Sequence, residues 1–286
     1  MRYLAPDTME AAVAMLAEAD GTSRILAGGT DVLVQMTSGL VVPDLVVDIK
    51  HIAGTNEITE EDGGYRIGAA VPSAAMNEHA GLKALWPGVV EAADLIGSTQ
   101  IQGRATIAGN LCNASPAADS VPALFAANAT ARVVGAGGTR DVPVTDIPTG
   151  VGRTSLAPTD IIQSIYLPAR PSGSGDAYQR FIPRTEMDIA VVGVGVSLTL
   201  DAGGTCTAAR VALGAVAETA FLLEGAEEIL VGSSLDDATL ERLAGAASAA
   251  CKPIDDKRGT KEFRIKVAGV LARRVTKIAA ERARGN

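Results

Sequence analysis

The stretch "ILAGGTD", residues 25–31, places two adjacent glycines between an apolar, strand-like segment and the apolar segment "VLVQM". Adjacent glycines cost conformational entropy, so they are typical of places where the backbone turns tightly or approaches another group closely. Consecutive backbone N–H groups in such a loop can form a concave anion site, and Thr30 adds a hydroxyl donor. On its own, however, this stretch is more typical of a plain turn between a strand and a helix.

Composition limits the classes of protein to consider. The chain has 286 residues, of which 47% are hydrophobic and 20% charged, which is typical of a globular protein with room for two or three domains. Its formal net charge of -8 argues against a basic nucleic-acid-binding face. The N-terminus lacks a signal-peptide pattern, and the longest apolar run, "IAVVGVGVSLTL", is shorter than the roughly 18–20 residues of a membrane helix. Three widely spaced cysteines indicate no disulfide framework, so we expect a cytoplasmic protein.

The N-terminal part of the chain mixes helical and strand patterns. Asp7 followed by Glu10 is typical of a capping box, which predicts that Asp7 caps the first helix. The segments "PDLVVDIK", "GGYRIGAA" and "DIIQSIYLP" favour strands, and "TARVVGAGGTRDVPV" favours a hairpin. A helix is expected from Ser73 to about Leu82. These patterns predict an α+β architecture.

A different pattern follows the segment "ARPSGSGD", residues 169–176, which is the best linker candidate because Pro, Ser and Gly cluster there. Beyond it, alternating apolar residues in "VVGVGVSLTL" and "TAARVALGAV" predict an antiparallel hairpin with one buried face. Three helices are expected after the hairpin, at residues 220–230, 236–251 and 262–284. The C-terminal part is therefore expected to be a sheet with a helical layer.

A second loop of small residues strengthens the anion-site interpretation. It lies within "RATIAGNLCNASPAADSVPAL", residues 104–124, and contains a hydroxyl, glycine and amide in "TIAGN". Two loops that suit phosphate suggest a diphosphate-containing ligand held between them. Asp119 follows the second loop, where it could accept hydrogen bonds from ligand hydroxyls or act as the N-cap of the next helix.

Several familiar chemistries lack their motifs. There is no G-x-G-x-x-G, G-x-x-x-x-G-K-[ST], H-E-x-x-H, C-x-x-C or G-x-S-x-G pattern, so a Rossmann site, a P-loop, a metal or Fe–S site in this chain and a hydrolase elbow are not indicated. His79 is expected to be a solvated surface residue, and Cys112 a small packed residue rather than a nucleophile.

Three segments in order resemble one known family. "AGGTD", then "TIAGNLCNASPAADS" about 80 residues later, then "RTEMDIAVVGVGVSL", are similar to motifs of the FAD-binding medium subunits of molybdenum hydroxylases, of the carbon monoxide dehydrogenase, nicotine dehydrogenase and xanthine dehydrogenase type. The resemblance extends over essentially the whole chain. It implies a two-lobed FAD-binding domain of the vanillyl-alcohol-oxidase (PCMH) type at residues 1–170 and a C-terminal domain at residues 175–286.

The resemblance also implies which residues bind FAD. Those at the pyrophosphate would be Ala27, Gly28, Gly29, Thr30 and Asp31, together with Thr106, Ile107, Ala108, Gly109 and Asn110. Asp119 would hold a hydroxyl of the cofactor, while Ile162 and Arg180 would lie near the flavin. Ile96 stands where xanthine dehydrogenases have a Phe, and Arg180 where some members have a Lys. These two departures weaken any transfer of NAD-linked chemistry.

The implied role is electron transfer, with no catalytic residue in this chain. Electrons would start at a molybdenum–pterin site in a large subunit, cross [2Fe–2S] clusters in a small subunit, reach FAD here and leave to an external acceptor, usually within a dimer of heterotrimers. The 4-hydroxybenzoyl-CoA reductase branch needs four cysteines in an insertion, which this chain lacks. Two alternatives stay open: a stand-alone FAD-dependent oxidoreductase, and an interaction subunit that has lost its cofactor.

Overall fold

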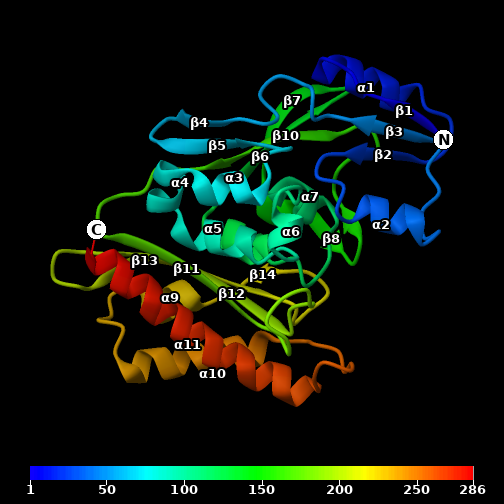
Figure 1. Ribbon diagram of the computed structural model, residues 1–286. Helices are drawn as coiled ribbons and strands as arrows, with labels where there is room; N and C mark the ends of the chain where they lie inside the picture. Colours follow the sequence, from blue (N-terminus) through cyan, green and yellow to red (C-terminus); the bar gives the residue numbers. More distant parts are fainter. Residues whose placement is uncertain (286) are drawn as a thin grey trace.

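The computed structural model describes residues 1–285, which form two α/β lobes followed by a C-terminal sheet with helices on both faces (Figure 1). In the first lobe, strands β1, β3 and β2 make a parallel sheet of three. In the second lobe, β4, β5, β10, β6 and β7 make an antiparallel sheet of five. The C-terminal sheet has the antiparallel order β11-β12-β13-β14. This mixed architecture confirms the predicted α+β class.

The elements have the following bounds. The strands are β1 (Arg2–Leu4), β2 (Ser23–Leu26), β3 (Leu45–Asp48), β4 (Ile58–Glu61), β5 (Gly64–Gly68), β6 (Thr130–Gly135), β7 (Gly138–Pro143), β8 (Pro148–Gly150), β9 (Arg153–Thr154), β10 (Ile161–Leu167), β11 (Ser174–Phe181), β12 (Val192–Leu200), β13 (Cys206–Gly214) and β14 (Phe221–Leu222). The helices are α1 (Met9–Ala17), α2 (Val32–Thr37), α3 (Ser73–Glu78), α4 (Ala80–Leu85), α5 (Pro87–Asp94), α6 (Thr99–Gln102), α7 (Ile107–Cys112), α8 (Ser120–Ala126), α9 (Ala226–Leu230), α10 (Asp237–Ala250) and α11 (Lys261–Gly285), with a 3-10 turn at Val144–Asp146.

Several local expectations need correction. Thr8, not Asp7, caps α1, because its side chain accepts the hydrogen bond from the Ala11 amide. The helix expected from Ser73 breaks at His79, whose side chain caps α4 by accepting from the Leu82 amide, so this residue is half-buried rather than simply solvated. The expected helix at residues 220–230 begins only at Ala226, after β14. The strand β11 starts inside the segment taken as a linker.

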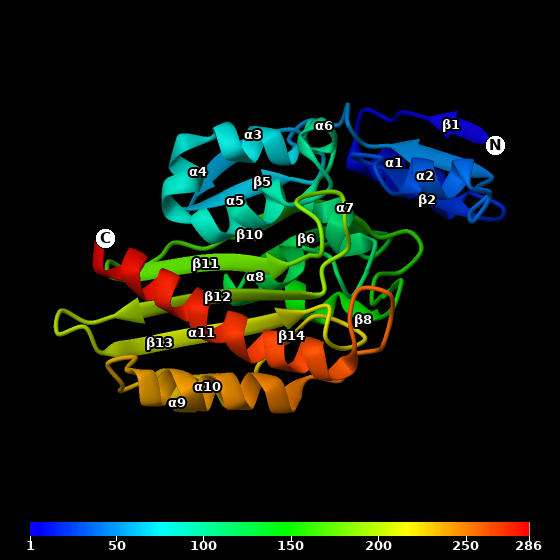
Figure 2. The ribbon, with the colours of Figure 1, turned by 60° about the horizontal axis from the view of Figure 1, so that its bottom comes forward.

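Alternating residue size explains how the C-terminal sheet is covered on both faces. Along β12 the valines pack with α10 and α11, while the intervening glycines face the other way. A Cβ on Gly195 would lie 2.6 Å from the carbonyl oxygen of Pro122 in α8, and one on Gly175 would lie 2.0 Å from that of Ala279 in α11. Glycine therefore lets both helices approach the sheet closely. Figure 2 shows α11 across one face of the sheet, with α8 on the other.

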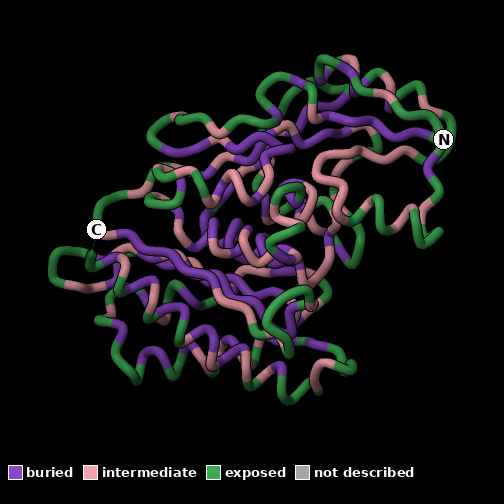
Figure 3. Tube along the Cα trace, in the orientation of Figure 1, coloured by how far each residue is buried: buried purple, intermediate pink, exposed green. Residues whose placement is uncertain are grey.

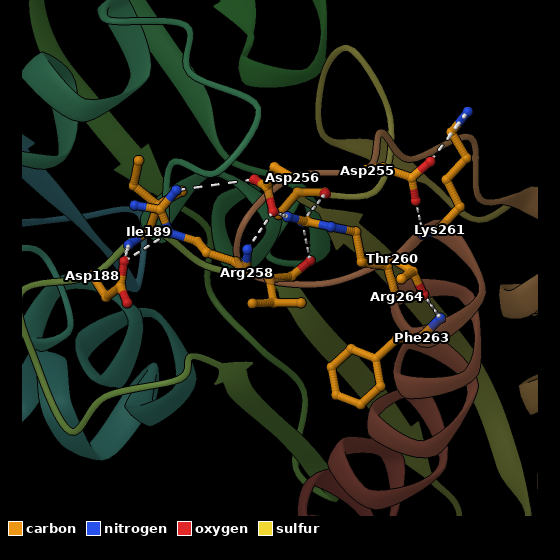
Figure 4. A network of polar contacts seen from close by, with 11 residues as sticks. Asp188, Ile189, Asp255, Asp256, Arg258, Thr260, Lys261, Phe263 and Arg264 are labelled. Carbon is orange, nitrogen blue, oxygen red and sulfur yellow. Dashed lines mark hydrogen bonds and ion pairs between the residues drawn. The ribbon is translucent and has the colours of Figure 1, made fainter.

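A polar network fixes the loop between β11 and β12 onto the start of α11 (Figure 4). Arg258 donates through Nε to Asp188 at 2.8 Å, and the buried guanidinium of Arg264 donates to Asp256 at 2.7 Å. Arg264 also donates to the carbonyl of Val191 at 2.8 Å. Hydrogen bonding from Arg258 lowers the pKa of Asp188, so this carboxylate stays ionised near neutral pH. No helix within residues 1–285 is long and apolar enough to cross a membrane.

Candidate cofactor site

The two glycine-containing loops meet at one cavity of about 650 Å³ between the lobes. β2 leads into the first loop and α2 leaves it, while the second loop is the start of α7. Ten of the residues singled out from the sequence line the cavity: Ala27, Gly28, Gly29, Thr30, Asp31, Thr106, Ala108, Gly109, Asn110 and Ile162. Ile107 is buried beside them as part of the core. The loops are nearly 80 residues apart in the sequence, yet the fold makes them two walls of one space.

The first loop needs its glycines for reasons within the chain. A Cβ on Gly28 would stand 2.0 Å from the carbonyl oxygen of Arg104, so only glycine lets this loop pass the segment that precedes α7. Gly29 has a φ of +80°, in the left-handed region that L side chains rarely adopt. Two needs within the chain therefore explain why both positions are glycine. Gly28 allows one loop to pack closely on the other, and Gly29 allows the tight turn.

The second loop is held by its own polar side chains. Thr106 is the N-cap of α7, and its Oγ1 accepts a hydrogen bond from the Gly109 amide at 3.0 Å. Asn110 is fixed to α8, because its Oδ1 accepts from the amide and the hydroxyl of Ser120 at 3.1 and 2.7 Å. The first amides of a helix have no partner within the helix. They carry the positive end of its dipole, so the start of α7 suits an anion.

Two side chains tie α2 to α7 across the cavity. Gln35 of α2 donates through Nε2 to Oδ1 of Asn113 at 3.3 Å. Cys112 lies exposed at the wall between them. Although the residue is open to the cavity, desolvation by the protein around its thiol raises the pKa of Cys112 to about 12, so the thiol remains protonated near neutral pH and is a poor nucleophile. The expectation that Cys112 is packed was wrong, since it borders the cavity.

Asp119 and Arg180 form a buried ion pair rather than part of the cavity wall. Asp119 accepts from Arg180 at 2.5 Å and from the hydroxyl of Tyr178 at 3.1 Å, which joins α8 to β11. Burial raises the pKa of Asp119 to about 6, although Arg180 and Tyr178 oppose that shift. Asp119 occupies the N-cap position of α8, but its side chain makes no capping hydrogen bond there. The Nε of Arg180 is buried without a partner among the described residues.

Comparison with known proteins identifies the family of the chain. Residues 1–170 match the family model described as the FAD-binding domain in molybdopterin dehydrogenase, and residues 177–279 match the model described as the CO dehydrogenase flavoprotein C-terminal domain. The chain belongs to this family. It is an FAD-binding oxidoreductase subunit, as the resemblance of its three motifs implied.

Relatives in the molybdopterin dehydrogenase family match along nearly their whole length. The carbon monoxide dehydrogenase medium chain of Afipia carboxidovorans is 33% identical over 99% of this chain and 97% of its own. Subunit alpha of the 6-hydroxypseudooxynicotine dehydrogenase complex of Paenarthrobacter nicotinovorans is 30% identical over 99% and 95%. The structure of reconstituted CO dehydrogenase from Oligotropha carboxidovorans superposes with a TM-score of 0.94 at 33% identity, covering 99% of this chain and 98% of that one.

The cavity fits the cofactor of this family. The Gly28–Gly29 turn and the start of α7 provide a wall for a diphosphate. Ile96 and Ile162 supply apolar wall, which suits a planar ring.

One cationic wall residue belongs to neither loop motif. Arg24 of β2 is the sole cationic side chain on the cavity wall within the described part of the chain. Two carboxylates share that wall. Asp31 is exposed, and partial desolvation raises its pKa, whereas hydrogen bonding from Arg140 at 2.6 Å lowers the pKa of Asp160. Arg24 could have been predicted as a site residue, because it is a basic residue in the strand that leads into the Gly-Gly loop. The residues Gly152 and Thr154 from the β8–β9 hairpin were also missed.

Proposed function

We propose that this chain is the FAD-carrying electron-transfer subunit of a multi-subunit molybdenum hydroxylase. The observation that carries the proposal is the convergence of two glycine-containing loops on one cavity of about 650 Å³. Electrons would arrive from the [2Fe–2S] clusters of a small partner subunit, pass through the bound flavin and leave to an external acceptor. The protein would supply binding, orientation and electrostatics.

The residues proposed to hold FAD divide into two groups. Backbone N–H groups of residues 27–31 and of Ile107 and Ala108, at the start of α7, would bind the pyrophosphate, and Arg24 would offset its charge. Ile96 and Ile162 would pack on the ring system. Asp119 and Arg180 lie off the cavity wall, so this buried pair would hold α8 and β11 in place behind the site rather than contact the cofactor.

The proposed partners are a large molybdenum-cofactor subunit and a small iron–sulfur subunit. The names of the relatives support this, since they describe a medium chain and a subunit of dehydrogenase complexes. Substrate oxidation would occur in the large subunit, so no residue of this chain is proposed as catalytic. We further propose a dimer of heterotrimers, domains at residues 1–170 and 175–286, and a cytoplasmic location.

Two measurements test this function. The visible spectrum of the purified chain should show bound flavin, and a colourless protein that takes up no added FAD would contradict the proposal. Purification from the native host should bring down an iron–sulfur subunit and a molybdenum subunit with the chain. Complete substrate turnover by the isolated chain would instead support a stand-alone FAD-dependent oxidoreductase.

A further inference from the structure

Ser120, the first residue of α8, is buried behind the wall of the cofactor cavity. Its exposed fraction is 0%, and all seven residues of α8 are buried, near the centre of the molecule (Figure 3). Ser120 does not line the cavity, yet its amide and its hydroxyl both donate to Oδ1 of Asn110, at 3.1 and 2.7 Å. Asn110 does line the cavity. The two hydrogen bonds therefore join a residue outside the cavity to one on its wall.

These bonds decide which way the side-chain amide of Asn110 faces. An Asn side chain can present either its oxygen or its NH2 group to a neighbour. A backbone N–H can only donate, so the atom that faces the Ser120 amide must be the oxygen. The Nδ2 group is thus turned away from Ser120. It makes no hydrogen bond to another described residue and is not sealed inside the protein, so it is a free donor at the cavity.

The need to cap α8 keeps the oxygen of Asn110 in place. Asp119 stands at the N-cap position of α8 but makes no capping hydrogen bond, since its two carboxylate oxygens accept from Tyr178 and Arg180. The oxygen of Asn110 accepts from the first amide of α8 instead. A buried amide without an acceptor costs free energy. The folding of α8 therefore sets the orientation of Asn110 before any ligand binds.

The free donor of Asn110 belongs to the same helix end as two free backbone amides. At the start of α7, the amides of Gly109 and Asn110 donate to the side chain and the carbonyl of Thr106, which leaves those of Ile107 and Ala108. Side chains in a helix lean toward its N-terminus, so the side chain of Asn110 leans toward these amides. A pyrophosphate has several anionic oxygens and can accept from all three donors.

We propose that Ser120 is a positioning residue of the cofactor site, which holds the amide of Asn110 so that Nδ2 donates to an oxygen of the FAD pyrophosphate. The inference rests on the proposed function, because it takes the cavity to hold FAD. Ser120 touches no cofactor atom and acts through Asn110. Without the Ser120 hydroxyl, one hydrogen bond instead of two would hold Asn110, and its donor would face the phosphate for less of the time.

Two matched serine variants of the full-length chain test the hydroxyl. Ser73 is the first residue of α3, is 0% exposed and lies off the cavity wall, and its hydroxyl donates to the carbonyl of Gln102 at 3.2 Å. Fluorescence titration with FAD should show that Ser120→Ala weakens binding by about three- to tenfold, whereas Ser73→Ala binds like the wild type. Equal FAD affinities of the two variants would overturn the proposal.

A double-mutant cycle shows whether Ser120 acts through Asn110. In an Asn110→Ala background there is no amide left to orient, so adding Ser120→Ala should not change the FAD affinity further. A purely structural role of the hydroxyl would lower the affinity by the same factor in both backgrounds. That additive result would overturn the proposal.

Asn110→Asp separates the cap of α8 from the donor at the cavity. A carboxylate keeps an oxygen for Ser120 but places a second, charged oxygen where Nδ2 was. We expect a melting temperature without FAD close to that of the wild type, and FAD binding at least about tenfold weaker. Binding of FAD as tight as in the wild type would overturn the proposal. If the wild-type chain itself bound no FAD, the proposed function would fail, which is a separate result.

Discussion

Gly28 and Arg104 lie so close that a Cβ on the glycine would stand 2.0 Å from the carbonyl oxygen of the arginine. This backbone contact holds the first glycine loop against the segment that leads into α7. The two loops that border the cavity are therefore packed on each other before any ligand is considered. The shape of the proposed FAD site depends on that contact.

The first expectation concerns this contact. Gly28→Ala should force the loops apart, lower the free energy of unfolding by about 1–3 kcal/mol and reduce the flavin content. Gly103→Ala is the matched control, because nothing lies within 4 Å of a Cβ at Gly103. Denaturant unfolding and flavin absorbance of both variants check this. Identical stability of the two variants would show that the loops are not held by close backbone packing.

A second expectation concerns the charge on the cavity wall. Arg24→Gln should weaken FAD binding by about tenfold, or about 1.4 kcal/mol, because the pyrophosphate loses its nearby cation. The variant should also show a weaker dependence of affinity on salt. Arg274→Gln, at an exposed position on α11, is the control. Equal FAD affinity of the two variants at low salt would exclude Arg24 from the pyrophosphate site.

The third expectation concerns Asp176, buried with Arg170 at 2.6 Å where the linker meets the C-terminal sheet. Burial raises the pKa of Asp176 to about 6 in the folded protein, above the value of about 3.9 expected when unfolded. The folded state thus binds the proton more tightly, so the contribution of Asp176 to stability is present at low pH and lost as pH rises to about 6.

Asp176→Asn removes this titration. The free energy of unfolding of each protein is compared at about pH 4 and about pH 6. The change between these two pH values should be larger in the wild type than in the variant by on the order of 2–3 kcal/mol. The wild type should lose more stability than the variant as the pH rises. Denaturant unfolding at several pH values measures both curves. Parallel curves would show that Asp176 has an ordinary pKa in the folded state.

A fourth expectation uses the cysteines as an internal comparison. Cys112 is exposed at the cavity wall, whereas Cys206 and Cys251 are buried in the C-terminal domain. Bound FAD should slow alkylation of Cys112 and leave the other two unchanged. The raised pKa of Cys112 means that alkylation should be slow near neutral pH and accelerate in base. Mass spectrometry after timed alkylation measures the rate at all three cysteines. If Cys112 is alkylated at the same rate with and without FAD, the cofactor must lie elsewhere.

The parts of the fold with strong local patterns were predictable from the sequence. The alternation of β12 and β13 and the turn between β6 and β7 depend on neighbouring residues, and the structure confirms them. Strand β11 was missed because "SGDAYQRF" alternates poorly and contains Gly and Asp. Its conformation comes from pairing along the whole of β12, which is a tertiary effect.

In the candidate site, too, features set by local sequence could be predicted, whereas contacts between distant segments could not. Both loops could be recognised, because glycines, hydroxyls and amides suit phosphate wherever they occur in a chain. The pairing of Asp119 with Arg180 could not, since 61 residues separate them and nothing local joins α8 to β11. Likewise, the contact of Gly28 with Arg104 arises only when the two loops are folded together.

The most direct measurement of the central claim compares FAD affinity in two glycine variants with the same backbone strain. Gly29 and Gly63 both have positive φ, +80° and +75°, and a Cβ at either would meet a side chain, at 2.9 Å from Leu26 Cδ1 and at 3.3 Å from Ala169 Cβ, but of the two only Gly29 lies on the cavity wall. Fluorescence titration with FAD should show Gly29→Ala binding at least about tenfold more weakly than Gly63→Ala. Equal affinities would contradict the placement of the FAD pyrophosphate between the two loops.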